Sequence, residues 1–369
     1  MSRLFRVALF LVLLFGFLGA ICFGVLLIVS GGQPVDFIQT ELIRFSLYFK
    51  QDELNSSVGT DATPVRFKVE PGDTPRLVAS NLLAANLISN ATVFVDYARI
   101  SELDTQFEAG TYFVNQTMTI PEMAVLLTDS ASSQFPFRIL EGWRIEEVAE
   151  AIDEAQPYFG FTGDDFLAVV GSGSTPDPVF AEAVGLPDGA SLEGFLFPDT
   201  YQLPAEITPE LLRDILIQNF FDKIGTQLQN DAEAEGFTLY EIVTVASIVQ
   251  REQSLEPDEH PLIASVYRNR LDVGMRLDAD PTVQYPLGSP ARWWPGITQA
   301  DYTGVISDYN TYLNAGLPPG PIANPSLTAI RAAVYPAESS YFYFRTDCNP
   351  EDHYHTFATT YDEHLANGC

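Results

Sequence analysis

Near its start the chain carries an apolar run that is long enough to cross a lipid bilayer. Residues 7–29, VALFLVLLFGFLGAICFGVLLIV, contain no charged side chain. At ~1.5 Å per residue, a helix of this length spans the ~30 Å hydrocarbon core of a membrane. A cleaved signal peptide is the competing interpretation, but its apolar region is usually only ~7–15 residues long. We therefore expect a retained transmembrane helix.

Basic residues on either side of this run predict its orientation. Arg3 and Arg6 precede it, and the next basic residue is Arg44. The positive-inside rule then leaves residues 1–6 in the cytoplasm as a short N-terminus. Everything after residue 30 is expected to lie outside the cytoplasm, so the sequence predicts a single-pass membrane protein.

The charge balance excludes one class of partner. The chain has 49 acidic and 19 basic residues, which gives a net charge of -30. Such a surface repels nucleic acid and anionic lipid headgroups, so we expect no nucleic-acid partner. Hydrophobic residues at 46% and aromatic residues at 12% are too abundant for a disordered acidic protein. The acidity therefore belongs to the surface of a folded protein.

Two of the three cysteines lie near the C-terminus, and Cys22 lies inside the apolar run. In an oxidising exterior Cys348 and Cys369 can pair and close a short loop, which the chain-entropy estimate values at ~3 kcal/mol. Two unpaired thiols are the alternative, and the sequence does not decide between them.

After a predicted juxtamembrane linker at 30–63, residues 64–130 have the pattern of a small domain. VRFKV at 65–69 alternates as a strand, PGDT turns, and 75–88 carries apolar residues at helical spacing. A helix at 93–100 follows, then a strand and a helix whose start is set by Thr119 and Pro121. This order resembles a LysM module, a fold that binds N-acetylglucosamine-containing glycans. A structural spacer without sugar affinity is the alternative.

Residues 131–369 continue with a second strand, turn and helix, and we expect a mixed α+β domain. FPFRIL at 135–140 is the strand, and LEGFLFPDTY at 192–201 places acids among aromatic side chains. Glu193 and Tyr201 are thus candidates for a sugar subsite, because aromatic faces stack on pyranose rings. The alternative is a packed turn in which Glu193 caps backbone amides.

One acid occupies a position where a helix calls for an apolar residue. Ile242, Val245 and Val249 share a helical face, and continuing their spacing puts Glu252 on the same face. Burial raises the pKa of a carboxyl, and an acid still protonated near neutral pH can donate a proton to a leaving group. A structural glutamate paired with Arg268 or Arg270 is the alternative.

The C-terminal third is predicted to be irregular between its helices. The segments 276–288 and 308–325 are rich in Tyr, Asn, Asp and Pro, which suits ordered loops that bind a polyhydroxylated ligand, and YFYF at 341–344 is predicted to be a central strand. A metal hypothesis involves four residues, Asp352, His353, His355 and His364. Because no familiar zinc spacing, G-x-S-x-G elbow or P-loop is present, we expect no metal, no cofactor and no serine-hydrolase or nucleotide chemistry.

Five segments closely resemble the MltG (YceG-like) family. In chain order they are ASIVQRE at 246–252, VYRNRL at 266–271, GMRLDADPTVQY at 274–285, YNTYLNAGLPPGPIANP at 309–325 and HTFATTYDEH at 355–364. The 192–201 segment, the membrane run and the LysM-like module fit as well. The resemblance implies a membrane-anchored endolytic murein transglycosylase, which cleaves the β-1,4 bond between N-acetylmuramic acid and N-acetylglucosamine in nascent glycan strands. It leaves 1,6-anhydro-muramoyl ends and limits strand elongation.

The resemblance also assigns roles. Its essential glutamate belongs to an ASIVEKE-like motif, which here ends in Gln250, Arg251 and Glu252, so Glu252 is the one acid of the motif left in this chain. We expect it to act as general acid and then base. The residues predicted to contact substrate or to shape the loops around it are Glu193, Tyr201, Asp280, Thr282, Tyr285, Tyr309, Asn310, Thr311 and Tyr312.

The expected setting is the bacterial inner (plasma) membrane, with the catalytic domain at 131–369 outside the cytoplasm. Peptidoglycan strands are the expected partner, together with cell-wall synthases in the membrane. Two other interpretations remain open: a glycan-binding scaffold of cell-wall synthesis with little or no activity, and a hydrolase that adds water to the same bond.

Overall fold

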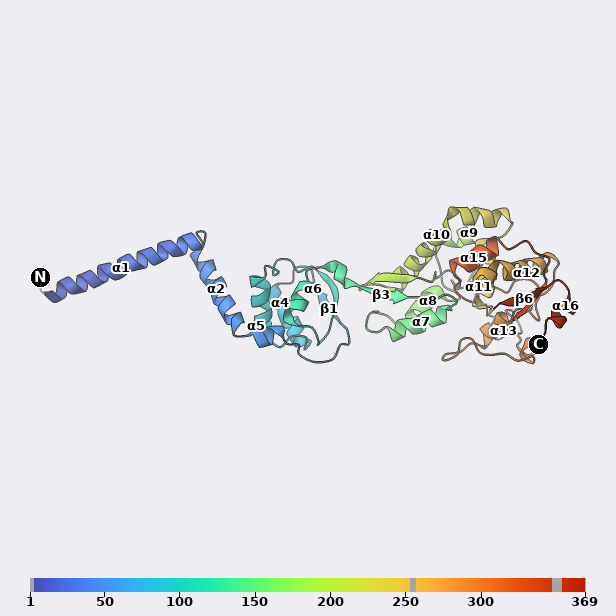
Figure 1. Cartoon of the computed structure of the whole chain (residues 1–369), viewed down its shortest axis with the longest axis horizontal. Helices are drawn as coiled ribbons and strands as arrows, with labels where there is room; N and C mark the ends of the chain where they lie inside the picture. Colours follow the sequence, from blue (N-terminus) through green and yellow to red (C-terminus); the bar gives the residue numbers. More distant parts are fainter. Residues whose placement is uncertain (1–2, 253–256, 347–353, 369) are drawn as a thin grey trace. The chain divides into compact units, whose positions relative to one another are not determined.

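The structure is a computed structural model that describes residues 3–252, 257–346 and 354–368, with the side chains of 3–13, 131–132 and 257 excepted. The chain divides into two compact units, Met1–Ser133 and Gln134–Cys369 (Figure 1). Both mix helices with short antiparallel strand pairs, so the predicted α+β class agrees with the structure.

The elements of the N-terminal unit, in chain order, are α1 (Arg3–Val29), α2 (Pro34–Tyr48), α3 (Gln51–Asn55), β1 (Val65–Val69), α4 (Pro75–Ala84), α5 (Ala91–Ile100), β2 (Gly110–Val114), α6 (Ile120–Leu126) and η1 (Ser130–Ser133). The helices of the C-terminal unit are α7 (Ile145–Glu154), α8 (Gly163–Val170), α9 (Pro178–Val184), α10 (Pro209–Ala234), α11 (Leu239–Arg251), η2 (Pro257–Glu259), α12 (His260–Asp272), α13 (Asp280–Leu287), α14 (Asp301–Gly304), α15 (Leu327–Val334) and α16 (Tyr361–Ala366). Its strands are β3 (Gln134–Arg138), β4 (Thr200–Pro204), β5 (Tyr343–Thr346) and β6 (His355–Ala358).

In the N-terminal unit, β1 and β2 pair antiparallel, and α4 to α6 supply a shared core. The side chain of Thr119 accepts from the Glu122 amide, and the Glu122 carboxylate accepts from the Thr119 amide at 2.8 Å. This capping box explains why α6 begins where the sequence predicted. The strand at 65–69 is likewise confirmed.

The segment 30–63, predicted to be a linker, is largely folded. It contains α2 and α3, and their residues Leu47 and Leu54 are buried in the same core as the strand pair. Only a few apolar residues, Ile43, Leu47 and Leu54, attach these helices to the core, so the polar composition of the segment gave no sign of them.

The N-terminal helices differ from a single straight membrane span. Among the described residues no one helix meets the length and hydropathy expected of a span, whereas Leu14–Val29 and Pro34–Tyr48 meet them as a pair bent by 80°. Cys22 lies exposed in α1 as a free thiol. Cys348 and Cys369, which the sequence analysis considered as a possible disulfide pair, lie outside the described residues.

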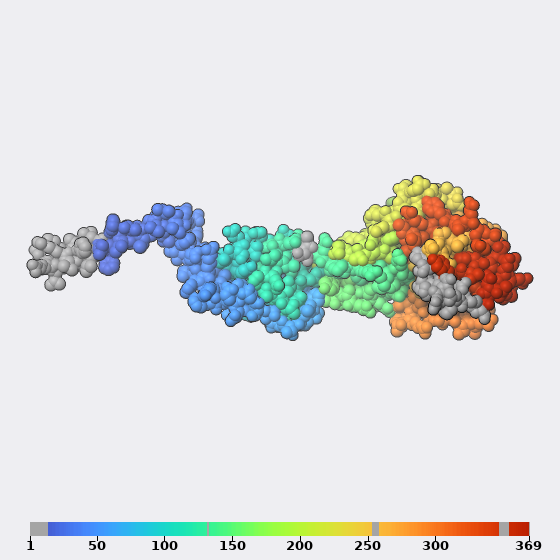
Figure 2. Space-filling view, viewed as in Figure 1, coloured from blue at the N-terminus to red at the C-terminus, as the bar shows by residue number. Residues whose placement is uncertain are grey.

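In the C-terminal unit α11 is the central helix, and every residue from 239 to 249 except Glu241 is buried. It packs against α15 and α12, while α7 and α8 pack together beside the β3–β4 pair. Thr238 and Glu241 form a capping box at the start of α11. The space-filling view shows the late segments of the chain, in orange and red, forming part of the visible face of this unit (Figure 2).

Two predictions about the C-terminal third are wrong. YFYF was expected to form a central strand, but within the described residues β5 pairs on one side only, with β6. The segment 276–288 was expected to be irregular, but α13 forms from Asp280 onward with Pro281 in its first turn. Proline is tolerated there because the first-turn amides of a helix have no intrahelical partner.

Candidate active site

Glu252 is the residue that follows the last turn of α11. It was predicted to continue the helix, but the helix ends at Arg251 and Glu252 adopts an extended conformation with φ -64° and ψ 141°. Its amide still donates to the Ile248 carbonyl at 3.0 Å. The buried helix therefore fixes the backbone of Glu252, and the change of direction turns its side chain out of the helix.

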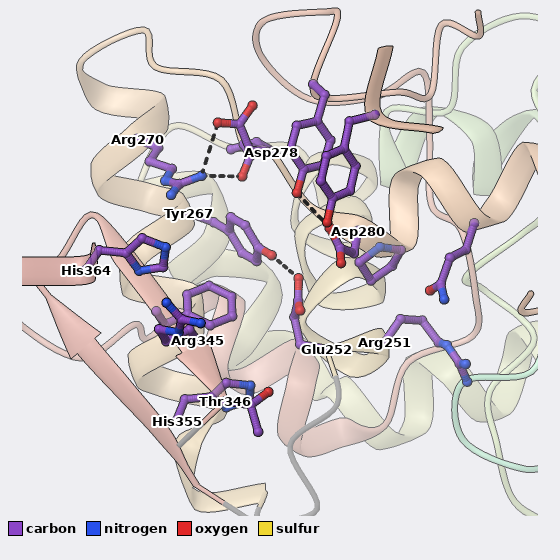
Figure 3. A pocket seen from close by; sticks show the side chains of 16 residues that line it. Arg251, Glu252, Tyr267, Arg270, Asp278, Asp280, Arg345, Thr346, His355 and His364 are labelled. Carbon is purple, nitrogen blue, oxygen red and sulfur yellow. Dashed lines mark hydrogen bonds and ion pairs between the residues drawn. The ribbon is translucent and has the colours of Figure 1, made fainter. Parts of the chain in front are cut away.

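This side chain faces a pocket of about 500 Å³ (Figure 3). The residues that line it are Arg251, Glu252, Tyr267, Arg270, Leu277, Asp278, Asp280, Pro281, Gln284, Tyr302, Tyr312, Phe344, Arg345, Thr346, His355 and His364. They come from α11, α12, α13, β5, β6, α16 and the loops between them. Segments separated by more than a hundred residues thus meet at Glu252.

Tyr267 holds the carboxyl in place. It lies on α12, is 1% exposed, and its hydroxyl donates to Oε1 of Glu252. Desolvation, followed by the nearby Glu252 charge, raises the pKa of Tyr267 well above its ordinary value, so the phenol stays a donor. The sequence contained this residue in the VYRNRL motif but offered no signal for the contact.

The surroundings of Glu252 make it a weak acid. Desolvation raises its pKa to about 7, and the charge of Asp280 acts in the same direction. The Tyr267 hydrogen bond and the charge of Arg270 oppose the rise by stabilising the carboxylate. The carboxyl therefore exchanges its proton near neutral pH, as expected of a residue that donates and then accepts one.

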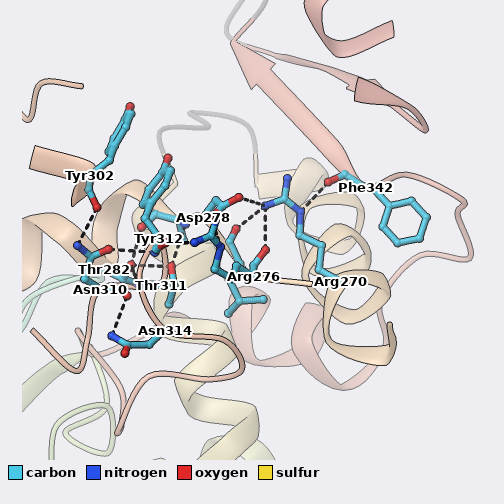
Figure 4. A network of polar contacts seen from close by, with 12 residues as sticks. Arg270, Arg276, Asp278, Thr282, Tyr302, Asn310, Thr311, Tyr312, Asn314 and Phe342 are labelled. Carbon is cyan, nitrogen blue, oxygen red and sulfur yellow. Dashed lines mark hydrogen bonds and ion pairs between the residues drawn. The ribbon is translucent and has the colours of Figure 1, made fainter. Parts of the chain in front are cut away.

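Neither arginine of the structural alternative forms an ion pair with Glu252. Arg268 pairs with Glu235 at 3.4 Å and stacks on Phe237. Arg270 donates through Nε to the Phe342 carbonyl at 2.6 Å and through a terminal nitrogen to the Leu277 carbonyl at 2.5 Å (Figure 4). Arg270 thus holds the loop after α12 in place, and its effect on Glu252 is the electrostatic one of its charge.

Asp280 and Tyr312, both predicted to contact substrate, line the pocket together. The Tyr312 hydroxyl donates to Oδ1 of Asp280 at 2.6 Å, and the Tyr302 ring stacks on Tyr312 with a centroid distance of 4.2 Å. The two parallel rings form an aromatic surface of the pocket that also contains Glu252 and Asp280. Asp280 is the first residue of α13.

Thr282, Asn310 and Thr311, predicted for the same role, lie beneath this surface and are fully buried (Figure 4). The two threonine hydroxyls are 2.8 Å apart, and the Thr311 hydroxyl accepts from the Ala279 amide. The Asn310 amide group donates to the carbonyls of Tyr302 and Val305. These side chains join the loop 302–314 to α13, which is the loop-forming role that the sequence analysis left open.

Glu193 and Tyr201 lie elsewhere in the unit and do not line the pocket. Glu193 is 1% exposed; its Oε2 accepts from the Ile145 amide at 3.2 Å, and Asn324 donates to Oε1 at 3.3 Å. The Tyr201 hydroxyl donates to the Phe197 carbonyl. This geometry matches the packed-turn alternative, and it gives no support to a sugar subsite at either residue.

Tyr285 and Tyr309 form a separate aromatic cluster. Their ring centroids are 4.7 Å apart, and the Arg144 guanidinium lies 4.0 Å above the Tyr285 ring. Arg251, which lines the pocket, lies 3.8 Å above Trp294. The sequence analysis did not single out Arg144 or the tryptophans, whose roles depend on contacts between distant segments.

The wall formed by β5, β6 and α16 adds basic groups that the sequence analysis considered only as metal ligands. His355 pairs through Nδ1 with Glu259 at 2.9 Å, and its amide donates to the same carboxylate at 2.8 Å. His364 stacks on Tyr343. Asp352 and His353 of the metal hypothesis lie outside the described residues.

Comparison with known proteins finds a family model and curated relatives that match most of this chain. The model of the YceG-like family matches residues 67–368. An endolytic murein transglycosylase of Bacillus subtilis is 28% identical over 310 residues, covering 82% of this chain and 83% of the relative. One from Streptococcus pneumoniae is 27% identical over 333 residues, covering 81% of this chain and 59% of the relative.

A solved structure agrees with these matches. The crystal structure of a putative yceG-like protein from Listeria monocytogenes superposes with a TM-score of 0.55 at 26% identity, covering 83% of this chain and 99% of that chain. Because sequence and fold agree over most of its length, this chain belongs to the YceG-like family.

Proposed function

We propose that this protein is an endolytic murein transglycosylase in which Glu252 is the general acid and base. The bond cleaved is the β-1,4 bond between N-acetylmuramic acid and N-acetylglucosamine in a glycan strand, and the product carries a 1,6-anhydro end. The relatives of the chain bear the name of this activity, and they share its family.

One observation carries the proposal: a carboxyl with a pKa of about 7 faces a polar pocket at the end of a buried helix. An acid with this pKa is substantially protonated at neutral pH, and its conjugate base is strong enough to take the proton back. A single residue can then serve both halves of the reaction.

The geometry suggests which oxygen carries the proton. Oε1 of Glu252 accepts from Tyr267, so the acidic proton belongs on Oε2. It passes to the glycosidic oxygen as the bond to the anomeric carbon breaks. The C6 hydroxyl of the same muramoyl residue then attacks that carbon, and its proton returns to the Glu252 carboxylate. One C–O bond breaks, one forms, and no water is consumed.

Asp280 is suited to stabilise the positive charge that develops on the sugar between bond cleavage and attack by the C6 hydroxyl. It lines the same pocket, and its negative charge already disfavours the ionised form of Glu252. An oxocarbenium-like transition state is positive, so a fixed carboxylate nearby stabilises it. The stacked Tyr302 and Tyr312 rings offer a face for the sugar on that side.

The N-terminal unit supports an anchoring role at the bacterial membrane, with the catalytic unit outside the cytoplasm. Beyond the apolar α1, helix α2 exposes large apolar side chains at helical spacing, namely Val35, Ile38, Leu42 and Phe45, and the C-cap residue Phe49 continues this row. The strand, two helices and strand from β1 to β2 support a LysM-like module that binds glycan. Cell-wall synthases in the same membrane are the partners we expect.

Product analysis tests the proposal. The full chain is incubated with uncrosslinked murein strands, and the new ends are identified by mass spectrometry. We expect anhydro ends from the wild type and none from Glu252→Gln, while Glu338→Gln, which changes an exposed acid of the same unit, remains active. Reducing ends, heavier by one water, would establish a hydrolase instead. Anhydro ends formed by Glu252→Gln at the wild-type rate would assign the proton transfer to another residue, and no new ends from the wild type would leave a glycan-binding scaffold.

A further inference from the structure

One wall of the pocket carries a basic pair to which the proposed mechanism assigns no task. Arg345 lies on β5 and His364 on α16, and the two elements pack together. The His364 ring stacks on Tyr343 with a centroid distance of 5.4 Å. In the view of Figure 3, Glu252 lies between this pair on one side and Asp280 on the other.

Both side chains have polar atoms that nothing in the described part of the chain satisfies. Nε of Arg345 and Nδ1 of His364 are buried and lack a hydrogen-bond partner there. Arg270 on α12, which lines the same pocket, shows the contrast, because its Nε and a terminal nitrogen both donate to carbonyls. Buried polar groups are nearly always paired in folded proteins, so two exceptions in one pocket wall call for an explanation.

The number of arginines that line the pocket is equally unusual for this protein. The chain has a net charge of -30 and only 19 basic Lys and Arg residues, yet Arg251, Arg270 and Arg345 all line this pocket. Desolvation lowers the pKa of His364, and the charges of Arg345 and Arg270 lower it further. The local field at His364 is therefore positive.

The acids of the pocket do not neutralise this corner. Asp278 lies 3.9 Å from Arg270 and 3.7 Å from Arg276, and Asp280 accepts from Tyr312. No ion pair of Arg345 is found among residues 3–252, 257–346 and 354–368. Arg345 is a partly buried cation whose Nε is shielded from water, so an anion that enters the pocket gains by pairing with it.

We propose that Arg345 and His364 form a carboxylate-binding subsite that recognises an acidic group of the murein strand. This inference rests on the proposed function and adds a specificity determinant to the same pocket. A guanidinium presents two parallel N–H donors that match the two oxygens of a carboxylate, and an imidazole N–H can add a third hydrogen bond.

Murein can supply that carboxylate from two sources. A strand without stem peptides carries a free carboxylate on the lactyl group of each muramoyl residue. A strand with stem peptides has that group in amide linkage and carries its carboxylates on the peptide instead. A chitin strand has the same sugar backbone without any carboxylate, so it is a neutral reference.

Binding by the catalytically silenced Glu252→Gln chain separates these cases. Calorimetry is run with four ligands of equal length: stem-free murein, murein with free peptide carboxylates, murein with amidated peptide carboxylates, and chitin oligomer. We expect at least one carboxylate-bearing ligand to bind roughly 10- to 100-fold more tightly than the amidated and chitin ligands. The ligand that shows this preference identifies the source.

Adding Arg345→Gln to the Glu252→Gln chain is expected to abolish the preference for carboxylate-bearing ligands and to leave the binding of neutral ligands unchanged. Arg345→Lys retains the positive charge but lacks the two parallel N–H donors, so it is expected to keep part of the preference. The matched control is Arg331→Gln, an exposed arginine of α15, which removes the same charge from the same unit. Unfolding curves of each variant establish that it is folded.

Two outcomes overturn the inference in different ways. If all four ligands bind alike, or if folded Arg345→Gln keeps the preference, the subsite does not exist and the proposed function stands. If neither murein nor chitin binds at all, the proposed function is refuted, and the subsite with it.

Discussion

Glu252 and Glu193 are both acids of the C-terminal unit whose pKa is raised chiefly by desolvation, but their surroundings differ. Glu252 follows the end of a helix, faces a pocket of about 500 Å³ and accepts from a tyrosine hydroxyl. Glu193 is enclosed, accepting from the Ile145 amide and from Asn324. Burial alone therefore raises a pKa without creating a catalyst; proton transfer also requires a pocket that admits the substrate.

The largest expected effect separates the two acids by activity. Glu252→Gln removes the transferable proton, so we expect the cleavage rate to fall by about 10²- to 10⁴-fold, whereas Glu193→Gln keeps an acceptor for the Ile145 amide and stays within a few-fold of wild type. Initial rates of anhydro-product formation measure both. Equal losses in the two variants would remove the distinction between them.

The next effect separates them by stability. Glu193→Ala leaves the buried Ile145 amide without its acceptor, and an unsatisfied buried donor costs about 1–3 kcal/mol. We expect urea denaturation to show a loss of that size, with Glu338→Ala, an exposed acid, as the control. A loss below a few tenths of a kcal/mol would show that Glu193 does not hold its turn together.

The pH dependence of stability follows from the direction of the Glu193 shift. Its pKa in the folded chain is well above the unfolded value, so the folded state binds the proton more strongly. Its contribution to stability is greatest below the unfolded pKa and declines as the pH rises toward the folded pKa. Glu193→Gln is expected to flatten that part of the stability curve, and an unchanged curve would contradict the shift.

Two neighbours of Glu252 are expected to move its titration in opposite directions. Tyr267→Phe removes a hydrogen bond that stabilises the carboxylate, which raises the pKa further above about 7, whereas Asp280→Asn removes a repelling charge and lowers it. The alkaline limb of kcat/KM against pH should shift upward in the first variant and downward in the second. Parallel shifts would rule out Glu252 as the group that titrates.

The smallest effect concerns Gln250, where the family motif has an acid. Oε1 of Gln250 accepts from the Ser326 amide at 2.9 Å, and a glutamate can keep that bond. We expect Gln250→Glu to retain most activity and to raise the Glu252 pKa slightly through the added negative charge, measured as a small upward shift of the same limb. A large loss would show that the neutral residue is required here.

Much of the local structure was predictable because it depends on near neighbours. The helix start at Thr119 follows from its capping side chain, and the strand at 65–69 follows from its alternation. The acid at 252 could be found because the helical face before it is apolar. Its position after the helix end could not, since a C-terminal boundary depends on what the following residues contact.

The contacts that form the pocket connect residues far apart in the chain. Tyr267 meets Glu252 across 15 residues, Thr311 meets Thr282 across 29, and Arg270 meets Phe342 across 72. No periodicity encodes such pairs, so the sequence analysis grouped Glu193 and Tyr201 with the substrate-contacting residues. It did not assign Tyr267 or Arg345 to the site, and it considered His355 only as a metal ligand.

The sequence by itself determined that the chain combines an apolar N-terminal helix with an α+β remainder, and that one acid of the family motif follows an apolar helical face, because these properties depend on spacing and local chemistry. Only the tertiary structure decided that Glu252 faces a pocket, that Glu193 is buried and accepts from a backbone amide, and that Arg345 and His364 line the same pocket as Glu252. The physical reason is that desolvation and access to substrate are properties of the packed surroundings, to which distant segments contribute together.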